Sequence, residues 1–130
     1  MNASKGPISS VKGGRERLLC LGIESTAHTF GASVVSSEGR VLADVNDVYK
    51  PPLGSGIHPR EASRHHGEVA QGVLQRCLRE AKVGLRQIDI IAFSAGPGLG
   101  PALRTGATVA RALAVWLDRP LVPVHHAIGH

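Results

Sequence analysis

The stretch Leu18-Leu19-Cys20-Leu21-Gly22-Ile23-Glu24-Ser25-Thr26 decides the expected fold. Its continuous apolar run is typical of a central strand that is buried on both faces. The run ends in three polar residues, Glu24, Ser25 and Thr26. We therefore expect a buried strand whose end offers a carboxylate, two hydroxyls and backbone N–H groups to a ligand. The plainer alternative is a solvated strand end with a turn-forming Ser/Thr pair.

Two further strands follow this run and complete a meander. Residues 31–35 and 40–49 have strand patterns, and the segment Ser36-Ser37-Glu38-Gly39 between them is typical of a turn. Residues 50–59 are rich in Pro and Gly, which excludes regular structure there. The first half of the chain therefore predicts three strands and a loop.

The second half of the chain alternates helices with strands. Residues 60–81 form a predicted helix, and residues 102–117 form a second one that is apolar or small nearly all round and is expected to be buried. Short strands are predicted at 88–93 and 121–124. The apolar stripe of the first helix consists of Val69, Val73, Leu74, Cys77, Leu78 and Ala81. The order β-β-β-α-β-α-β indicates an α/β fold, a mixed sheet with helices packed on it.

Length and composition fit a single globular domain. The chain has 130 residues, of which 42% are hydrophobic and 19% charged, and residues 1–17 read as a disordered basic tail. No apolar run approaches the ~18–20 residues that a membrane span needs, and the N-terminus has no apolar segment of a secretory signal. Cys20 and Cys77 lie in apolar contexts and are expected to be buried free thiols. A cytoplasmic protein without a membrane partner is the resulting expectation.

The charge balance permits, without proving, contact with nucleic acid. The formal net charge is +5, and much of the excess lies in the first seventeen residues. Aromatic residues are only 3% of the chain, which argues against a stacking platform for single-stranded bases. The arginines are scattered, so the sequence places no basic patch for nucleic acid.

A glycine-rich loop precedes the second predicted helix. It reads Gly96-Pro97-Gly98-Leu99-Gly100-Pro101, and such a loop lets backbone approach a ligand closely beside the positive end of a helix. It lacks the Gly-Lys-Ser/Thr of a phosphate-binding Walker loop and the glycine spacing of the dinucleotide fingerprint. A plain tight turn remains the alternative.

Histidines form the third candidate. His126 and His130 stand four residues apart, so on a helix both would lie on one face and could share one metal ion. No glutamate follows the first histidine, which excludes the zinc-protease pattern, and further ligands must come from elsewhere. His65 and His66 near the start of the first helix are expected at the surface or at an interface.

Together and in order, these segments resemble the tRNA N6-adenosine threonylcarbamoyltransferase family, TsaD-like in bacteria and the catalytic subunit of the KEOPS complex in archaea and eukaryotes. The Lys-Pro-Pro and Gly-Ile-His-Pro-Arg-Glu-Ala stretches look archaeal or eukaryotic. The matching segments are Leu21-Gly22-Ile23-Glu24-Ser25-Thr26, Tyr49-Lys50-Pro51-Pro52, Gly56-Ile57-His58-Pro59-Arg60-Glu61-Ala62, His65-His66, Ser94 to Arg104 and His125 to His130.

The resemblance implies an actin/hexokinase/Hsp70-like (ASKHA) fold with two lobes. Residues 18–130 would be the N-terminal lobe, with the second lobe absent from this chain. The implied reaction moves the threonylcarbamoyl group from threonylcarbamoyl-AMP to N6 of adenosine 37 in tRNAs that read ANN codons. Because the family's third protein metal ligand and most nucleotide-holding residues lie further downstream, the chain alone is not expected to carry out this transfer.

The resemblance also implies site residues and partners. His126 and His130 match ligands of a catalytic iron or zinc ion. Residues 24–26 and 96–98, namely Glu24, Ser25, Thr26, Gly96, Pro97 and Gly98, match the loops beside threonylcarbamoyl-AMP or ATP. The implied partners are tRNA and KEOPS subunits, above all the small kinase, and residues 60–81 are a candidate contact surface. The alternatives are a non-catalytic binding lobe or split subunit and, with little support, a metalloendopeptidase.

Overall fold

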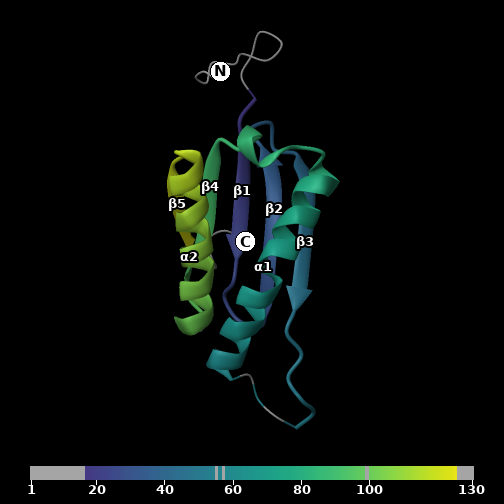
Figure 1. The fold of residues 1–130 in the computed structure, drawn as a ribbon, viewed down its shortest axis with the longest axis vertical. Helices are drawn as coiled ribbons and strands as arrows, with labels where there is room; N and C mark the ends of the chain where they lie inside the picture. The colour runs from purple at the N-terminus through teal and green to yellow at the C-terminus, as the bar shows by residue number, and fades with distance from the viewer. Residues whose placement is uncertain (1–16, 55, 57, 99, 126–130) are drawn as a thin grey trace.

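Strand β1 (Leu19–Glu24) lies at the centre of a five-stranded sheet. The structure is a computed structural model that describes residues 17–54, 56, 58–98 and 100–125. The strand order is β3-β2-β1-β4-β5 (Figure 1). The other elements are β2 (Thr29–Ser36), β3 (Val41–Val48), α1 (Pro59–Ala81), the 3₁₀ turn η2 (Leu85–Gln87), β4 (Ile90–Gly96), α2 (Gly100–Leu117) and β5 (Leu121–His125).

The sheet is mixed, as the sequence predicts. β1 pairs antiparallel with β2, and β2 pairs antiparallel with β3, which forms the meander. On its other side β1 runs parallel to β4, and β4 runs parallel to β5. The carboxyl ends of β1, β4 and β5 therefore meet at one edge of the sheet. The order and bounds of the strands and helices agree with the expected elements to within a few residues, and only the short turn η2 is missing from the prediction.

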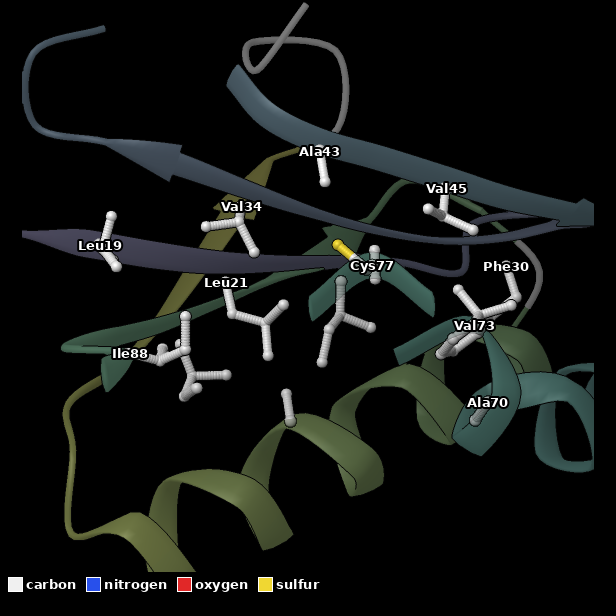
Figure 2. Close-up of a cluster of buried hydrophobic side chains, with 14 of the residues drawn as sticks. Leu19, Leu21, Phe30, Val34, Ala43, Val45, Ala70, Val73, Cys77 and Ile88 are labelled. Carbon is white, nitrogen blue, oxygen red and sulfur yellow. The ribbon is translucent and has the colours of Figure 1, made fainter. Parts of the chain in front are cut away.

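The hydrophobic core lies between the sheet and the two helices. Leu19, Leu21 and Ile23 alternate along β1 and belong to one buried cluster with Val73 and Cys77 of α1. Figure 2 shows the Leu21 side chain pointing from β1 toward the helices. The intervening residues of β1 are only half-buried. The expectation that this strand is buried on both faces is therefore wrong for the described part of the chain, where both helices cover the same face (Figure 1).

The two helices differ in how they meet the core. The predicted stripe of α1 packs against it as expected. α2 buries one narrow face of small residues, whereas Val115 and Trp116 on its outer face are 76% and 61% exposed. The expectation of a helix buried all round is wrong, because only the inner face of α2 is covered within the residues described. Small side chains along that inner face let the helix lie close to β1 and β4.

Both cysteines are free, as expected, but their burial differs. Cys77 is fully buried, and burial raises the pKa of its thiol to about 11. Cys20 is only half-buried, because it lies on the sheet face that the helices leave uncovered. The proposed tail, residues 1–17, lies outside the described residues except for Arg17. None of the helices in the described ranges is long and apolar enough to cross a membrane.

Truncation of a buried side chain on the central strand should destabilise the folded chain. Leu21 has no exposed surface, so Leu21→Ala is expected to lower the free energy of unfolding by about 2–5 kcal/mol through lost burial and a cavity. The matched control is Val41→Ala, because Val41 is 64% exposed and its truncation should change stability by less than about 0.5 kcal/mol. Urea denaturation followed by circular dichroism measures both, and equal losses would contradict this account of the core.

Candidate functional site

The loop after β1 and the loop after β4 meet at the carboxyl edge of the sheet. The backbone N–H of Ser25 donates to the Ser94 hydroxyl of β4 over 3.1 Å. Gly98 lies so close to Thr26 that a Cβ at position 98 would overlap the Thr26 backbone. Residues 24–26 and 96–98, separately predicted from the sequence, are thus brought into contact. In open α/β sheets, the crevice outside the carboxyl ends of the strands is the usual place for a ligand.

Ser25 and Thr26 are buried, so neither belongs to a solvated strand end. The Ser25 hydroxyl points under α2, where a Cβ on Gly106 would overlap it. That hydroxyl has no hydrogen-bond partner among the residues described. The Thr26 hydroxyl donates to Glu24 Oε2 over 3.3 Å, which fixes the carboxylate at the strand end.

Glu24 faces the side of the sheet that the helices leave uncovered. A depression of about 250 Å³ lies there, and its polar lining comes from four strands. Since Glu24 and Ser25 are neighbours, their side chains point to opposite faces, and only the Glu24 carboxylate reaches this depression. The polar residues that line it are Glu24, Ser33, Asp44, Asn46 and Ser94.

The glycine loop owes its shape to residues that tolerate unusual backbone. Gly96 has a φ of 139°, which disfavours a side chain, and the Gly96–Pro97 peptide bond is cis. Gly98 leaves room for the Thr26 carbonyl. The amino end of α2 follows at Gly100, so backbone N–H groups and the positive end of a helix dipole lie beside the loop. This chemistry suits an anionic group such as a phosphate.

The proposed metal ligands His126 and His130 lie outside the described residues. Within those ranges, no group of three or more His, Cys, Asp or Glu side chains is placed to hold one ion. His125, the last described residue, ends β5 at the same sheet edge as the two loops. The prediction of a metal site thus stays a prediction.

His66 corrects one expectation about the site. The sequence predicts it at the surface or at an interface, yet its side chain is fully buried within this chain, and its Nε2 lies 2.8 Å from the carbonyl oxygen of Ala27. Burial lowers the pKa of this imidazole below its ordinary value. The spacing of Ala62, His66 and Ala70 could have predicted this burial, because residues four apart on a helix share one face, here the buried face of α1.

Comparison with known proteins identifies the family. A sequence model described as "TsaD: tRNA N6-adenosine threonylcarbamoyltransferase" matches residues 40–130. The chain belongs to this family. A tRNA N6-adenosine threonylcarbamoyltransferase of Caldivirga maquilingensis is 56% identical over 113 residues, which cover 87% of this chain and 34% of the relative. A Hyperthermus butylicus protein of the same name is 53% identical over 92% of the chain and 33% of its own length. The chain therefore spans about a third of the curated relatives it matches.

Solved structures confirm the ASKHA-type lobe. YeaZ from Pseudomonas aeruginosa has a TM-score of 0.65 and 26% sequence identity, covering 83% of this chain and 43% of that one. RuvC of T. thermophilus, in complex with a Holliday junction substrate, has a TM-score of 0.51 and 15% identity, over 83% of this chain and 64% of RuvC. The RuvC likeness concerns the fold alone. The archaeal relatives also agree with the archaeal look of the sequence motifs.

Substitution of Gly98 should test the contact between the two loops. Gly98→Ala forces a methyl group against the Thr26 backbone, which cannot rotate away, and should cost about 1–3 kcal/mol of stability. Gly72→Ala is the matched control, because a Cβ at this α1 position meets nothing within 4 Å and should stabilise the helix by up to about 1 kcal/mol. Thermal and urea unfolding measure both. A neutral Gly98→Ala would show that the loops are not in contact.

The buried histidine predicts a pH dependence of stability. Because the folded state lowers the pKa of His66 below 6.5, the unfolded chain binds more protons as the pH falls through about 6.5. The contribution of neutral His66 to stability is therefore complete above this pH and is lost below it. We expect His66→Gln to flatten this part of the profile in urea titrations from about pH 8 to about pH 5. An unchanged slope would contradict the burial of His66.

Proposed function

We propose that this chain forms the N-terminal lobe of an enzyme that transfers the threonylcarbamoyl group from threonylcarbamoyl-AMP to N6 of adenosine 37 in ANN-decoding tRNAs. The observation that carries the proposal is the contact between residues 24–26 and 96–98 at the carboxyl edge of the sheet. Membership of the family supports the reaction class. A cytoplasmic location is part of this proposal, because a tRNA-modifying enzyme needs access to tRNA.

In the proposed reaction, N6 of the adenosine attacks the carbamoyl carbonyl carbon of threonylcarbamoyl-AMP. A C–N bond forms, the C–O bond to the phosphate breaks, and AMP leaves with the bonding electron pair while N6 loses a proton. The backbone of the 96–98 loop and the amino end of α2 are suited to hold the phosphate of the leaving group. Glu24, fixed by the Thr26 hydroxyl, is suited to orient a polar group of the substrate from the other face.

His126 and His130 are the proposed ligands of an iron or zinc ion, with the remaining ligands contributed from outside residues 1–130. Imidazole nitrogens suit either metal. When bound, such an ion supplies Lewis-acid polarisation of a carbonyl oxygen. No step assigned above to residues 24–26 and 96–98 depends on it.

We also propose that the protein works with KEOPS subunits, above all the small kinase. An apolar patch on α2 supports the existence of a partner surface, since large apolar side chains seldom gather on an unpartnered face. It consists of the exposed side chains of Val115 and Trp116, and the Arg86 guanidinium lies 4.9 Å from the Trp116 ring centroid. The outer face of α1, expected from the sequence to make this contact, has mostly charged and polar exposed residues instead.

Nucleotide titration followed by NMR tests the site. AMP, and a stable analogue of threonylcarbamoyl-AMP, should shift the backbone amide signals of Ser25, Thr26 and Gly98. The analogue should bind the Gly98→Ala variant about tenfold more weakly, because a displaced loop loses about one hydrogen bond to the phosphate. Gly72→Ala should bind like the natural chain.

Two results would contradict the proposal. If the nucleotide leaves these amide signals unmoved and shifts the amide signals of the outer face of α2, a non-catalytic binding lobe would be favoured. Modified tRNA formed by the chain alone would show that the site is complete without a second lobe.

A further inference from the structure

Three side chains outside the proposed substrate loops, those of Asp47, His65 and His66, form a hydrogen-bonded row. The row ends at the backbone of the first of these loops. His65 Nε2 lies 2.8 Å from Asp47 Oδ1, His65 Nδ1 lies 2.9 Å from His66 Nδ1, and His66 Nε2 lies 2.8 Å from the Ala27 carbonyl oxygen. Asp47 belongs to β3, the histidines to α1, and Ala27 directly follows Thr26. The row therefore links the half-exposed Asp47 to the backbone of the first substrate loop.

Aromatic contacts hold this row in place. The His66 ring lies against Phe30, with ring centroids 5.8 Å apart, and the His65 ring lies against Tyr49 at 5.7 Å. The Tyr49 hydroxyl in turn donates to Glu61 Oε1 over 2.7 Å. Both imidazole planes are thus fixed by packing, so their nitrogens cannot exchange partners freely.

The geometry determines how many protons the row holds. A carbonyl oxygen only accepts, so His66 Nε2 must carry a hydrogen. The carboxylate of Asp47 also only accepts, so His65 Nε2 must carry one as well. One further hydrogen has to lie between the two Nδ1 atoms, because two lone pairs would repel each other there. The two imidazoles therefore hold three protons, one more than two neutral rings.

The extra proton gives the pair one positive charge, which the Asp47 carboxylate balances. His66 is fully buried, whereas the His65 side chain keeps 15% of its surface exposed. Burial disfavours charge, so the charge resides on His65, and His66 stays neutral with its hydrogen on Nε2. The depressed pKa of His66 agrees with this distribution. The other titratable group that acts on His66 is His28, whose charge would also oppose protonation of His66.

We propose that Asp47, His65 and His66 are positioning residues that fix the Ser25–Ala27 loop through one shared proton. Loss of this proton leaves two acceptors facing each other somewhere in the row, and a second extra proton leaves two donors facing each other. In both cases the repulsion displaces the imidazole rings, and displacement of the His66 ring loosens its bond to the Ala27 carbonyl. The proposal rests on the proposed function only in treating this loop as substrate-binding.

NMR of the full chain tests the row without an activity assay. Nitrogen-15 signals of the imidazoles, followed from about pH 5 to about pH 8, should show His66 protonated at Nε2 alone and His65 at both nitrogens while the proton is held. Loss of the proton should move both rings with one common midpoint. The backbone amide of His28, which shares its peptide plane with the Ala27 carbonyl, should move with that same midpoint.

Three variants distinguish an effect on the position of the Ser25–Ala27 loop from a general loss of structure. Asp47→Asn keeps an acceptor but removes the charge, so the common midpoint should fall. His66→Gln keeps a donor for the Ala27 carbonyl without a titrating ring, so the His28 amide should keep its position and lose its pH dependence. His66→Phe fills the space without a donor, so the signal of that amide should be displaced at every pH.

His58→Gln is the matched control, because His58 is exposed and its side chain makes no capping bond to α1. This variant should leave the midpoint and the His28 amide unchanged. The proposal would be overturned if the two rings had separate midpoints. It would also be overturned if Asp47→Asn left the pH midpoint of the His28 amide signal unchanged. Because these signals are read without nucleotide, failure of the analogue to bind would count against the proposed function and leave this result intact.

Discussion

Parallel pairing of β1 with β4 places the ends of these two strands side by side, and the proposed site depends on this pairing. The register aligns Ile23 with Phe93, so Ser94 stands beside the end of β1. The Ser94 hydroxyl then accepts the N–H of Ser25, which would otherwise be a buried donor without a strand partner. A shift of this register would separate the two loops, however well each was formed.

Close approach of backbone to backbone is the second requirement. Gly98 and Gly106 stand where any Cβ would overlap Thr26 or Ser25. The first glycine lets the two loops touch, and the second lets α2 lie directly over the end of β1. Glycine in a helix interior costs stability, which the close packing at Gly106 offsets. The small residues of α2 are therefore explained by contact with the loop after β1 as well as by the core.

Sequence patterns predicted the strand order of the meander, both helices and the positions of the two loops at residues 24–26 and 96–98, because each depends on local periodicity or on Gly and Pro. These patterns did not predict how many faces of each element are covered by the rest of the chain. The apolar run of β1 and the small residues of α2 both indicated complete burial, yet each element is covered on one face within the residues described. Periodicity tells which residues are apolar, and it does not tell how many layers lie on a sheet.

By itself, therefore, the sequence determined the elements, their order and the family to which the chain belongs. Only the tertiary structure decided that Ser25 points beneath α2, that Glu24 faces the uncovered side, and that His66 is buried against the Ala27 carbonyl. The physical reason is distance along the chain. Ala27 and His66 stand 39 residues apart, and Ser25 and Ser94 stand 69 apart, so only the packing of the sheet against its helices brings them together.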